Sequence, residues 1–330
     1  MGLPVVFCSE TAWARHGADL RRVGQFELLE FFPGVRVEPA DVERIDIAFF
    51  STDLYPDHAP SFLRVCLDAP RLGWIHVFSA GVDHPVFGLM LDKGSRLTTS
   101  SGASAIPIAH HVVMSLLALA RDLPGHLRDQ GAHEWRPREV DDLEGRTVGV
   151  VGMGPIGIES ARLAQQLGMR AIGMRRTVSG DEPCDTWAFD RLDDLLAVVD
   201  DLVLALPLTE DTRGLIGERE LALLRPGGRI VNVGRGELID EAALIRSLES
   251  GHLGGAALDV FATEPLPIDS ALWDMANVIV TPHSSGRAAS SGRRAGELFA
   301  ENLGYFLAGS PMRNEVHRCP TRPPEGRLRE

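Results

Sequence analysis

The chain contains 330 residues, of which 44% are hydrophobic and 24% are charged, a composition typical of globular proteins and a length sufficient for two domains. Its formal net charge of −13 and its lack of a basic block argue against a nucleic-acid or anionic-membrane partner. The N-terminus shows no signal-peptide pattern and no apolar run long enough for a bilayer, which predicts a cytoplasmic protein. Four scattered cysteines, Cys8, Cys66, Cys184 and Cys319, lack metal-ligand spacing, so we expect reduced thiols and no metal site.

The first hundred residues alternate short apolar runs with helix-like stretches. This alternation predicts a parallel sheet covered by helices. The runs that we interpret as strands are Leu3–Cys8, Ile45–Phe50, Trp74–Phe78 and Leu97–Thr99.

A very apolar helix is predicted next, from Ser104 to Arg121. Ser104 suits the N-cap, and most of the following positions are apolar on nearly every face of the helix. Such a helix should be buried between two bodies of protein, which suits a connector between domains. Its adjacent histidines, His110 and His111, point in different directions on a helix, so packing or a hydrogen bond explains them better than a shared metal.

A second alternation begins at Arg146 and predicts a doubly wound sheet of six strands. A final helix is predicted near Ser290–Leu307, and the polar, Pro-rich tail from Arg318 is predicted to be disordered. The six strands are Thr147–Val151, Arg170–Met174, Asp201–Ala205, Arg229–Val233, Gly255–Leu258 and Val278–Val280.

Three glycines with the spacing G-x-G-x-x-G follow the first of these strands: Gly152, Gly154 and Gly157. The first permits a tight turn, the second lets a pyrophosphate approach the backbone, and the third lets the helix and strand pack closely. Phosphates then bind the free N–H groups at the start of the following helix, Ile158–Leu167. Because a strand and a helix frame it, the motif favours a dinucleotide site over an ordinary turn.

Three charged residues, Arg235, Glu264 and His283, each come after the end of a strand in this predicted sheet. Ligands of open α/β sheets bind beyond the carboxyl ends of the strands. Each residue alone could be an ordinary loop residue, but three of them at one edge favour a functional site.

These segments resemble the D-isomer-specific 2-hydroxyacid dehydrogenase family, particularly its glyoxylate and hydroxypyruvate reductase branches. The resemblance extends from Phe78–His84 to Thr281–His283 and covers nearly the whole chain, with several motifs in the family's order. It implies an α/β fold with two doubly wound parallel-sheet domains. A Rossmann nucleotide domain, residues 103–287, would be inserted in a flavodoxin-like substrate domain, residues 1–102 and 288–330. This insertion explains why the glycine motif lies in the middle of the chain.

The three charged side chains suit the reduction of a 2-oxo acid. The planar guanidinium of Arg235 matches a carboxylate and can aim the adjacent carbonyl. His283, as an imidazolium, can protonate the carbonyl oxygen while a hydride arrives from a nicotinamide. Glu264 can accept a hydrogen bond from the other ring nitrogen, which fixes the tautomer and favours the charged ring.

The resemblance implies further contacts with substrate and cofactor. Backbone N–H groups around Ala80, Gly81 and Val82 would bind the substrate carboxylate, although Gly81 could be a simple turn glycine. Asp259 resembles the acid that bonds the nicotinamide carboxamide, although it could be only a loop acid. The remaining cofactor-binding residues would be Gly152, Gly154, Pro155, Ile156, Gly157, Pro207, Thr212, Val233, Gly234, Ser285 and Gly286.

The end of the second nucleotide-domain strand departs from the NAD pattern. An NAD-specific fold usually has an acid about 20 residues beyond the first glycine, where it holds the ribose 2′-hydroxyl. This chain instead has Arg175, Arg176 and Thr177, which suit a 2′-phosphate, with no carboxylate present to repel it. We therefore predict a preference for NADP(H), with NAD(H) as a second cofactor. The alternative is that these are exposed surface arginines.

The segment Gln130–Pro137 resembles the arm with which family members embrace a second subunit, so we expect a homodimer. Trp135 would reach toward the partner's active site, or would pack against its own domain. The pocket for the substrate's side chain would draw on Ser51–Tyr55, Phe78 and Trp135.

The sequence therefore predicts an oxidoreductase that transfers a hydride between NAD(P)H and a small 2-oxo acid or D-2-hydroxy acid, with glyoxylate or hydroxypyruvate as the first candidates. Two alternatives use the same fold: a nucleotide-sensing binding protein similar to the family's corepressor relatives, and a phosphite dehydrogenase. A formate dehydrogenase is disfavoured because that branch pairs its histidine with glutamine, where this chain has Glu264.

Overall fold

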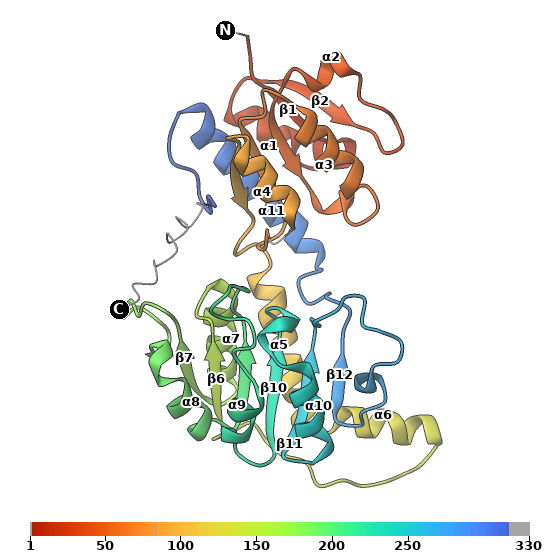
Figure 1. Cartoon of the computed structure of the whole chain (residues 1–330), viewed down its shortest axis with the longest axis vertical. Coiled ribbons are helices and arrows are strands. Elements are labelled where there is room, and N and C mark those ends of the chain that lie inside the picture. Colours follow the sequence, from red (N-terminus) through yellow and green to blue (C-terminus); the bar gives the residue numbers. More distant parts are fainter. Residues whose placement is uncertain (1, 83, 317–330) are drawn as a thin grey trace, which may run out of the picture. The chain divides into compact units, whose positions relative to one another are not determined.

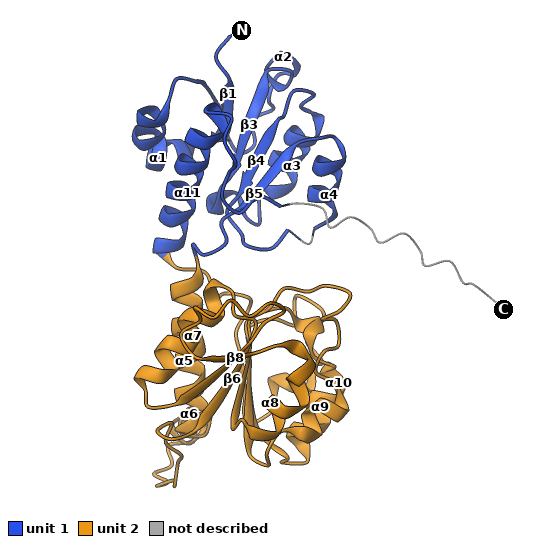
Figure 2. Ribbon diagram, turned by 90° about the vertical axis from the view of Figure 1, so that its left-hand side faces the viewer, with its two compact units in different colours: residues 1–103, 289–330 blue, residues 104–288 orange. Residues whose placement is uncertain are grey.

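The computed structural model describes residues 2–82 and 84–316. The chain forms two compact units, Met1–Ala103 with Ala289–Glu330 and Ser104–Ala288, which Figure 2 shows in blue and orange. Their boundaries lie one residue beyond those that the sequence predicts. The tail that begins at Arg318 lies outside the described residues.

In the described part of the first unit, five parallel strands form one sheet in the order β2-β1-β3-β4-β5. This order is the 2-1-3-4-5 arrangement of flavodoxin-like folds, which the resemblance implies. The strands are β1 Val5–Ser9, β2 Glu27–Phe31, β3 Ile45–Phe50, β4 Trp74–Val77 and β5 Arg96–Thr99.

Helices cover both faces of this sheet, with α1 and α11 on one side and α3 and α4 on the other (Figure 2). Successive strand residues point to opposite faces, so the neighbours Phe49 and Phe50 enter different cores. The buried hydroxyl of Ser9 caps α1 by accepting the backbone N–H of Ala12 at 3.0 Å. The helices are α1 Glu10–Val23, α2 Pro39–Val42, the short 3₁₀ helix η1 Thr52–Leu54, α3 Ala59–Asp68, α4 Pro85–Asp92 and α11 Ala289–Leu307.

Every residue of the second unit is described, and seven parallel strands form its sheet in the order β12-β11-β10-β9-β6-β7-β8. The order reverses at β6, which pairs with both β7 and β9, as in a doubly wound nucleotide-binding fold. The strands are β6 Thr147–Val151, β7 Arg170–Met174, β8 Asp185–Trp187, β9 Asp201–Leu204, β10 Gly228–Asn232, β11 Leu253–Leu258 and β12 Val278–Val280.

Two layers of helices cover this second sheet, with α5 and α7 on one face and α8, α9 and α10 on the other (Figures 1 and 2). Because both faces are covered, its central strands are continuous apolar runs rather than alternating ones. The helices are α5 Ala105–Ala120, α6 Leu123–Ala132, α7 Pro155–Gln166, α8 Leu192–Val198, α9 Glu218–Leu223, α10 Glu241–Glu249 and the 3₁₀ helices η2 Phe189–Arg191, η3 Gly236–Leu238 and η4 Ala271–Trp273.

Two strands were missed by the sequence analysis, β2 in the first unit and β8 in the second. Both lie at the edge of a sheet, and β8 has only three residues. An edge strand needs no continuous apolar run, because it has one strand neighbour and is less fully covered. The prediction of six strands for the second unit is therefore wrong by one.

Helix α5 is less completely buried than its sequence predicts. Residues such as Ala109, Val112 and Leu116 are buried, but Met114 is 50% exposed and Leu117 is 39% exposed. Within the described residues no single helix is long and apolar enough to cross a membrane, although α5 and α6 pass that test as a pair bent by 64°. The prediction of a helix buried between two bodies of protein is therefore wrong at Met114 and Leu117.

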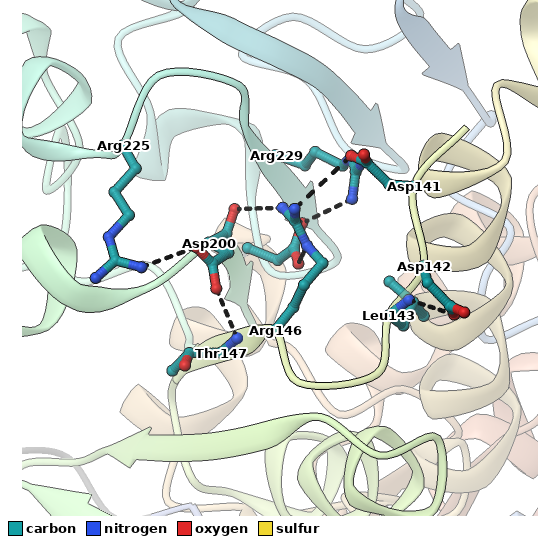
Figure 3. Close-up of polar contacts among 9 residues, drawn as sticks. Asp141, Asp142, Leu143, Arg146, Thr147, Asp200, Arg225 and Arg229 are labelled. Atoms are coloured by element: carbon teal, nitrogen blue, oxygen red, sulfur yellow. Dashed lines mark hydrogen bonds and ion pairs between the residues drawn. The ribbon is translucent and has the colours of Figure 1, made fainter. Parts of the chain in front are cut away.

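A network of charged side chains ties together the amino ends of β6, β9 and β10 (Figure 3). The fully buried carboxylate of Asp201 accepts two hydrogen bonds from Arg146, at 2.9 and 3.2 Å, and lies 3.5 Å from Nη1 of Arg229. Arg229 also pairs with Asp141. Burial raises the pKa of the Asp201 carboxyl, and its arginine neighbours oppose that shift.

Candidate active site

The glycine motif forms the turn between β6 and α7. Gly152 has a φ of +104°, which disfavours any side chain, and a Cβ there would lie 2.7 Å from the backbone of Ala205. A Cβ on Gly157 would lie 2.0 Å from the carbonyl oxygen of Gly152, so α7 packs directly against the turn. A Cβ on Gly154, the N-cap of α7, would meet no atom within 4 Å. The backbone is therefore open at the position where a phosphate would approach.

This turn lies where the strand order reverses. Gly152 and Met153 donate their backbone N–H groups to the carbonyl oxygen of Met174, at 2.9 and 3.2 Å, which joins the turn to the end of β7. On the other side, Ala205 donates its N–H to Val151 at 2.9 Å. Doubly wound sheets bind their ligands at such a reversal.

Arg235 lies in the loop that follows β10. The buried side chain of Asn232 organises this loop, because its Nδ2 donates to the carbonyl oxygen of Arg235 at 2.9 Å and its Oδ1 accepts the N–H of Gly234 at 3.0 Å. Gly236 lies so close to Phe261 that a Cβ would be 1.8 Å from that residue's carbonyl carbon. The loop of Arg235 is thus packed against the segment that leads to Glu264. Sequence analysis missed Asn232, although an asparagine ending a buried strand was a usable signal.

Glu264 and His283 form a hydrogen-bonded pair in which His283 Nδ1 lies 2.8 Å from Glu264 Oε2. The other oxygen of Glu264 accepts the backbone N–H of Phe261 at 3.1 Å, so the carboxylate is held at both ends. The His283 side chain is 51% exposed and the Glu264 side chain 37%. Since Nδ1 faces the carboxylate, proton transfer to a ligand would use Nε2.

The loop of His283 is held in an uncommon backbone conformation. His283 has a φ of +47°, which costs free energy for a residue with a side chain. The buried carboxylate of Asp259 holds this loop by accepting hydrogen bonds from Thr281 Oγ1 at 2.6 Å and from the N–H groups of Ser284 and Ser285 at 2.9 and 3.0 Å. Asp259 therefore positions the loop that carries the histidine.

The two adjacent histidines of α5 have different surroundings. His110 is exposed, whereas His111 Nε2 lies 3.4 Å from Thr281 Oγ1. Burial lowers the pKa of His111. The hydrogen bond that the sequence analysis preferred to a metal is present at His111, and it links α5 to the loop of His283.

The end of β7 differs from its sequence-based description. Arg175 Nη1 lies 2.9 Å from Oε1 of Glu182, whose side chain is only 3% exposed. Hydrogen bonds from the hydroxyl and the backbone N–H of Ser179 lower the pKa of Glu182 to about 2, so this carboxylate is ionised at neutral pH. The expectation that no carboxylate lies beside these arginines is therefore wrong, because residues 176–182 fold back onto Arg175.

The other residues that the sequence analysis assigned to this part of the cofactor site are either in a weak ion pair, exposed, or hydrogen-bonded to the backbone. Arg176 and Asp211 lie 3.5 Å apart and are 75% and 84% exposed, which makes a weak pair. Thr177 is exposed. Thr212 is buried, and its hydroxyl donates to the carbonyl oxygen of Pro207 at 2.9 Å, which fixes the loop after β9.

The first unit contains the other expected substrate contacts. Residues 80–82 lie in the loop after β4, where Ser79 Oγ donates to the carbonyl oxygen of Gly81 at 2.8 Å; Asp83 lies outside the described residues. The ring of Phe78 lies 5.8 Å from that of Tyr55, so these two expected pocket residues are neighbours. In the second unit, Trp135 is 96% exposed, which contradicts the alternative that it packs against its own domain.

Comparisons with known proteins agree with this geometry. The model of the family described as D-isomer specific 2-hydroxyacid dehydrogenase, NAD binding domain, matches residues 113–285, which include the glycine turn and all three charged residues. D-3-phosphoglycerate dehydrogenase of Mycobacterium tuberculosis is 36% identical over 257 residues, which are 77% of this chain and 48% of that protein.

The chain belongs to the D-isomer specific 2-hydroxyacid dehydrogenase family.

Two solved structures are similar to this chain over almost its whole length. A D-isomer specific 2-hydroxyacid dehydrogenase from Xanthobacter autotrophicus, in complex with NADPH and MES, is 32% identical with a TM-score of 0.78, and the match covers 96% of this chain and 98% of that one. An NADPH-dependent glyoxylate/hydroxypyruvate reductase from Sinorhizobium meliloti, in complex with NADP and sulfate, is 31% identical with a TM-score of 0.76 and the same coverage. By contrast, the chain spans about half the length of the phosphoglycerate dehydrogenases that it matches.

Proposed function

We propose that this 2-hydroxyacid dehydrogenase is an NADP(H)-preferring reductase of small 2-oxo acids, with glyoxylate and hydroxypyruvate as the first candidates. The Glu264–His283 pair, at 2.8 Å, carries the proposal, because a carboxylate on Nδ1 orients an imidazole for acid–base catalysis. Arg235, on a loop packed beside the segment of Glu264, supplies a cation for the substrate carboxylate. The similarity to the reductase from Sinorhizobium meliloti supports the substrate class.

The proposed reaction divides the work among the three side chains. The guanidinium fork of Arg235 binds the substrate carboxylate and aims the 2-oxo group. His283 donates a proton from Nε2 to the carbonyl oxygen as the carbonyl carbon gains a hydride, which gives the D-2-hydroxy acid. A bound NADPH supplies that hydride. Glu264 stabilises the imidazolium before the transfer and holds its orientation, and in the oxidative direction His283 accepts the proton.

The second unit has the features that a dinucleotide requires. The open backbone at Gly154 and the start of α7 would hold the pyrophosphate, and the loop fixed by Thr212 would line the adenosine. Val233, Gly234, Ser285 and Gly286 would lie toward the nicotinamide. The preference for the phosphorylated cofactor rests on Arg175, Arg176 and Thr177, and the complexes of two similar proteins with NADPH and NADP support it.

A steady-state panel tests this function. Glyoxylate, hydroxypyruvate, pyruvate and 3-phosphohydroxypyruvate are each measured with NADPH and with NADH. We expect the highest kcat/KM for glyoxylate or hydroxypyruvate with NADPH. Comparable kcat/KM with NADH would refute the proposed cofactor preference. A higher kcat/KM for 3-phosphohydroxypyruvate would identify that compound, rather than glyoxylate or hydroxypyruvate, as the preferred substrate. Retained cofactor binding without activity on any 2-oxo acid would favour a nucleotide-sensing binding protein. In a separate assay, oxidation of phosphite with reduction of NADP+ or NAD+ would identify a phosphite dehydrogenase.

We also infer that the chain forms a homodimer through α5 and α6. Apolar side chains are exposed along both helices, including Met114, Leu117 and Leu127, and Met114 and Leu117 line an apolar groove of about 560 Å³. Exposed apolar surface of this kind marks interaction sites. The fully exposed Trp135 follows α6 and is suited to contact a second copy.

Sedimentation of the whole chain tests the dimer. The wild type should sediment as a dimer at micromolar concentration, and Met114→Glu should shift it toward the monomer. Ile268→Glu is the matched control, because Ile268 is 97% exposed in a loop remote in sequence from these helices. A monomeric wild type, or an equal effect of both substitutions, would contradict the proposed interface.

A further inference from the structure

Glu182 is bound like a ligand by donors at the end of β7. Its Oε1 accepts hydrogen bonds from Arg175 Nη1 at 2.9 Å, the Ser179 N–H at 2.8 Å and the Ser179 hydroxyl at 2.7 Å. Its Oε2 accepts the Gly180 N–H at 2.8 Å. One guanidinium, one hydroxyl and two backbone N–H groups thus surround a single carboxylate, which leaves it 3% exposed.

This donor set has the chemistry of a phosphate site. Phosphate oxygens are recognised by arginine, by hydroxyl groups and by successive backbone N–H groups in a turn. Here the anion comes from the chain itself, seven residues after Arg175. The Ser179 hydroxyl also contacts Asp181, so a second carboxylate lies at the same turn.

The position of Arg175 connects this internal ion pair to the proposed cofactor. The residue before it, Met174, accepts the N–H groups of Gly152 and Met153 through its carbonyl oxygen. Arg175 therefore follows directly the backbone that supports the glycine turn. In doubly wound folds, the end of this strand is where the ribose 2′-substituent is read.

We infer that Glu182 sets the strength of the cofactor preference, because its carboxylate engages the donors that a 2′-phosphate of NADP(H) would use. The phosphate gains Arg175 only by sharing it with Glu182 or by displacing that carboxylate. The negative charge of Glu182 also repels a dianionic phosphate, whereas the neutral 2′-hydroxyl of NAD(H) is unaffected. The inference rests on the proposed binding of NADP(H) and identifies a residue that limits it.

Binding of two cofactor fragments to the whole protein provides the test, measured by titration calorimetry. The fragments are 2′,5′-ADP, which carries the 2′-phosphate, and 5′-AMP, which lacks it. For Glu182→Gln we expect the affinity for 2′,5′-ADP to rise at least about fivefold, the effect of two unit charges about 4 Å apart even when bulk water screens them. The affinity for 5′-AMP should stay within about twofold, because its 2′-hydroxyl carries no charge to be repelled.

Two further variants separate charge from folding. Glu218→Gln removes a carboxylate from an exposed pair with Arg246 and should change neither affinity. Glu182→Asp keeps the charge on a shorter side chain and should give a smaller gain than Glu182→Gln. Arg175→Gln should weaken 2′,5′-ADP selectively, and adding Glu182→Gln to it should produce a smaller gain than Glu182→Gln alone, because only the charge repulsion is then removed.

The outcomes distinguish this inference from the proposed function. An unchanged or weakened affinity of Glu182→Gln for 2′,5′-ADP, with 5′-AMP binding intact, overturns the inference even if the wild type reduces 2-oxo acids with NADPH. If Glu182→Gln loses 5′-AMP binding, its cofactor site no longer folds and Glu182→Asp replaces it as the test. A selective gain of Glu182→Asp in affinity for 2′,5′-ADP then supports the inference, and no gain refutes it. Because the titrations contain no 2-oxo acid, a protein without dehydrogenase activity still tests the role of Glu182.

Discussion

The two ends of the second unit's sheet use the same kinds of charged residue in different ways. At the amino end, Asp201 is fully buried and Arg229 is 7% exposed, and these side chains pair with one another. At the carboxyl end, His283 and Glu264 are 51% and 37% exposed, and backbone groups fix them as much as side chains do.

This difference separates stability from chemistry. Charges that satisfy each other in a buried network hold the strands together and offer little to a ligand, and breaking such a pair is costly. Charges held by the backbone at an open edge keep their outer atoms available for binding. Asp259 shows how the open edge is held in place, because its buried carboxylate accepts hydrogen bonds from the loop that carries His283.

Replacing His283 should have the largest effect at the carboxyl end. For His283→Gln and His283→Ala we expect turnover to fall about 10²–10⁴-fold, the usual contribution of a general acid–base group. Urea unfolding should change little, because the side chain is half exposed. Nearly unchanged turnover would show that His283 is not the acid–base group. It would also weaken the distinction between a stabilising amino end and a catalytic carboxyl end of the sheet.

Breaking the buried network should damage stability instead. Asp201→Ala leaves Arg146 and Arg229 without their shared buried carboxylate, so we expect unfolding free energy to fall by about 3–5 kcal/mol. The control Arg225→Ala removes the exposed partner of Asp200 (Figure 3) and should cost at most about 1 kcal/mol. Chemical denaturation measures both, and a turnover loss in correctly folded Asp201→Ala would show that the amino end also serves catalysis.

Arg235→Ala should weaken substrate binding at the carboxyl end. A hydrogen bond to a charged group contributes about 1.5–3 kcal/mol, so the substrate KM should rise about 10- to 100-fold. Arg235→Lys keeps the charge but loses the planar fork, and its KM should lie between those of Arg235→Ala and the wild type. A fall in turnover with an unchanged substrate binding constant would refute the carboxylate-binding role.

The smallest effect concerns the pH dependence of Glu182. Hydrogen bonds from Ser179 lower its pKa to about 2 from an ordinary carboxyl value near 4.5. The contribution of Glu182 to stability is thus fully present above the pKa that its carboxyl has in the unfolded chain. It is lost as the pH falls through the lower pKa that the carboxyl has in the folded protein. Wild type and Glu182→Gln should therefore differ by a constant unfolding free energy above about pH 5, and the difference should shrink below about pH 4.5. A difference in unfolding free energy that stays constant down to pH 3 would contradict an ionised Glu182 paired with Arg175.

Much of the fold could be predicted because its signals are local. Central strands such as β6 and β7 match their predicted bounds, since strands buried on both faces are continuous apolar runs. Edge strands β2 and β8 were missed because pairing with a neighbour, rather than their own composition, makes them strands. Similarly, the apolar positions of α5 predicted a fully covered helix, but which of them the rest of the chain covers depends on packing.

The candidate site divides in the same way. The sequence by itself determined the glycine turn and the order of Arg235, Glu264 and His283, because a backbone that must turn tightly and pack closely admits only glycine and because parallel strands bring their carboxyl ends to one edge. The structure contains the pair of Glu264 and His283 that the sequence analysis expected. Only the tertiary structure placed Glu182 on Arg175, since the fold of a loop, and not its composition, sets the distances between charges.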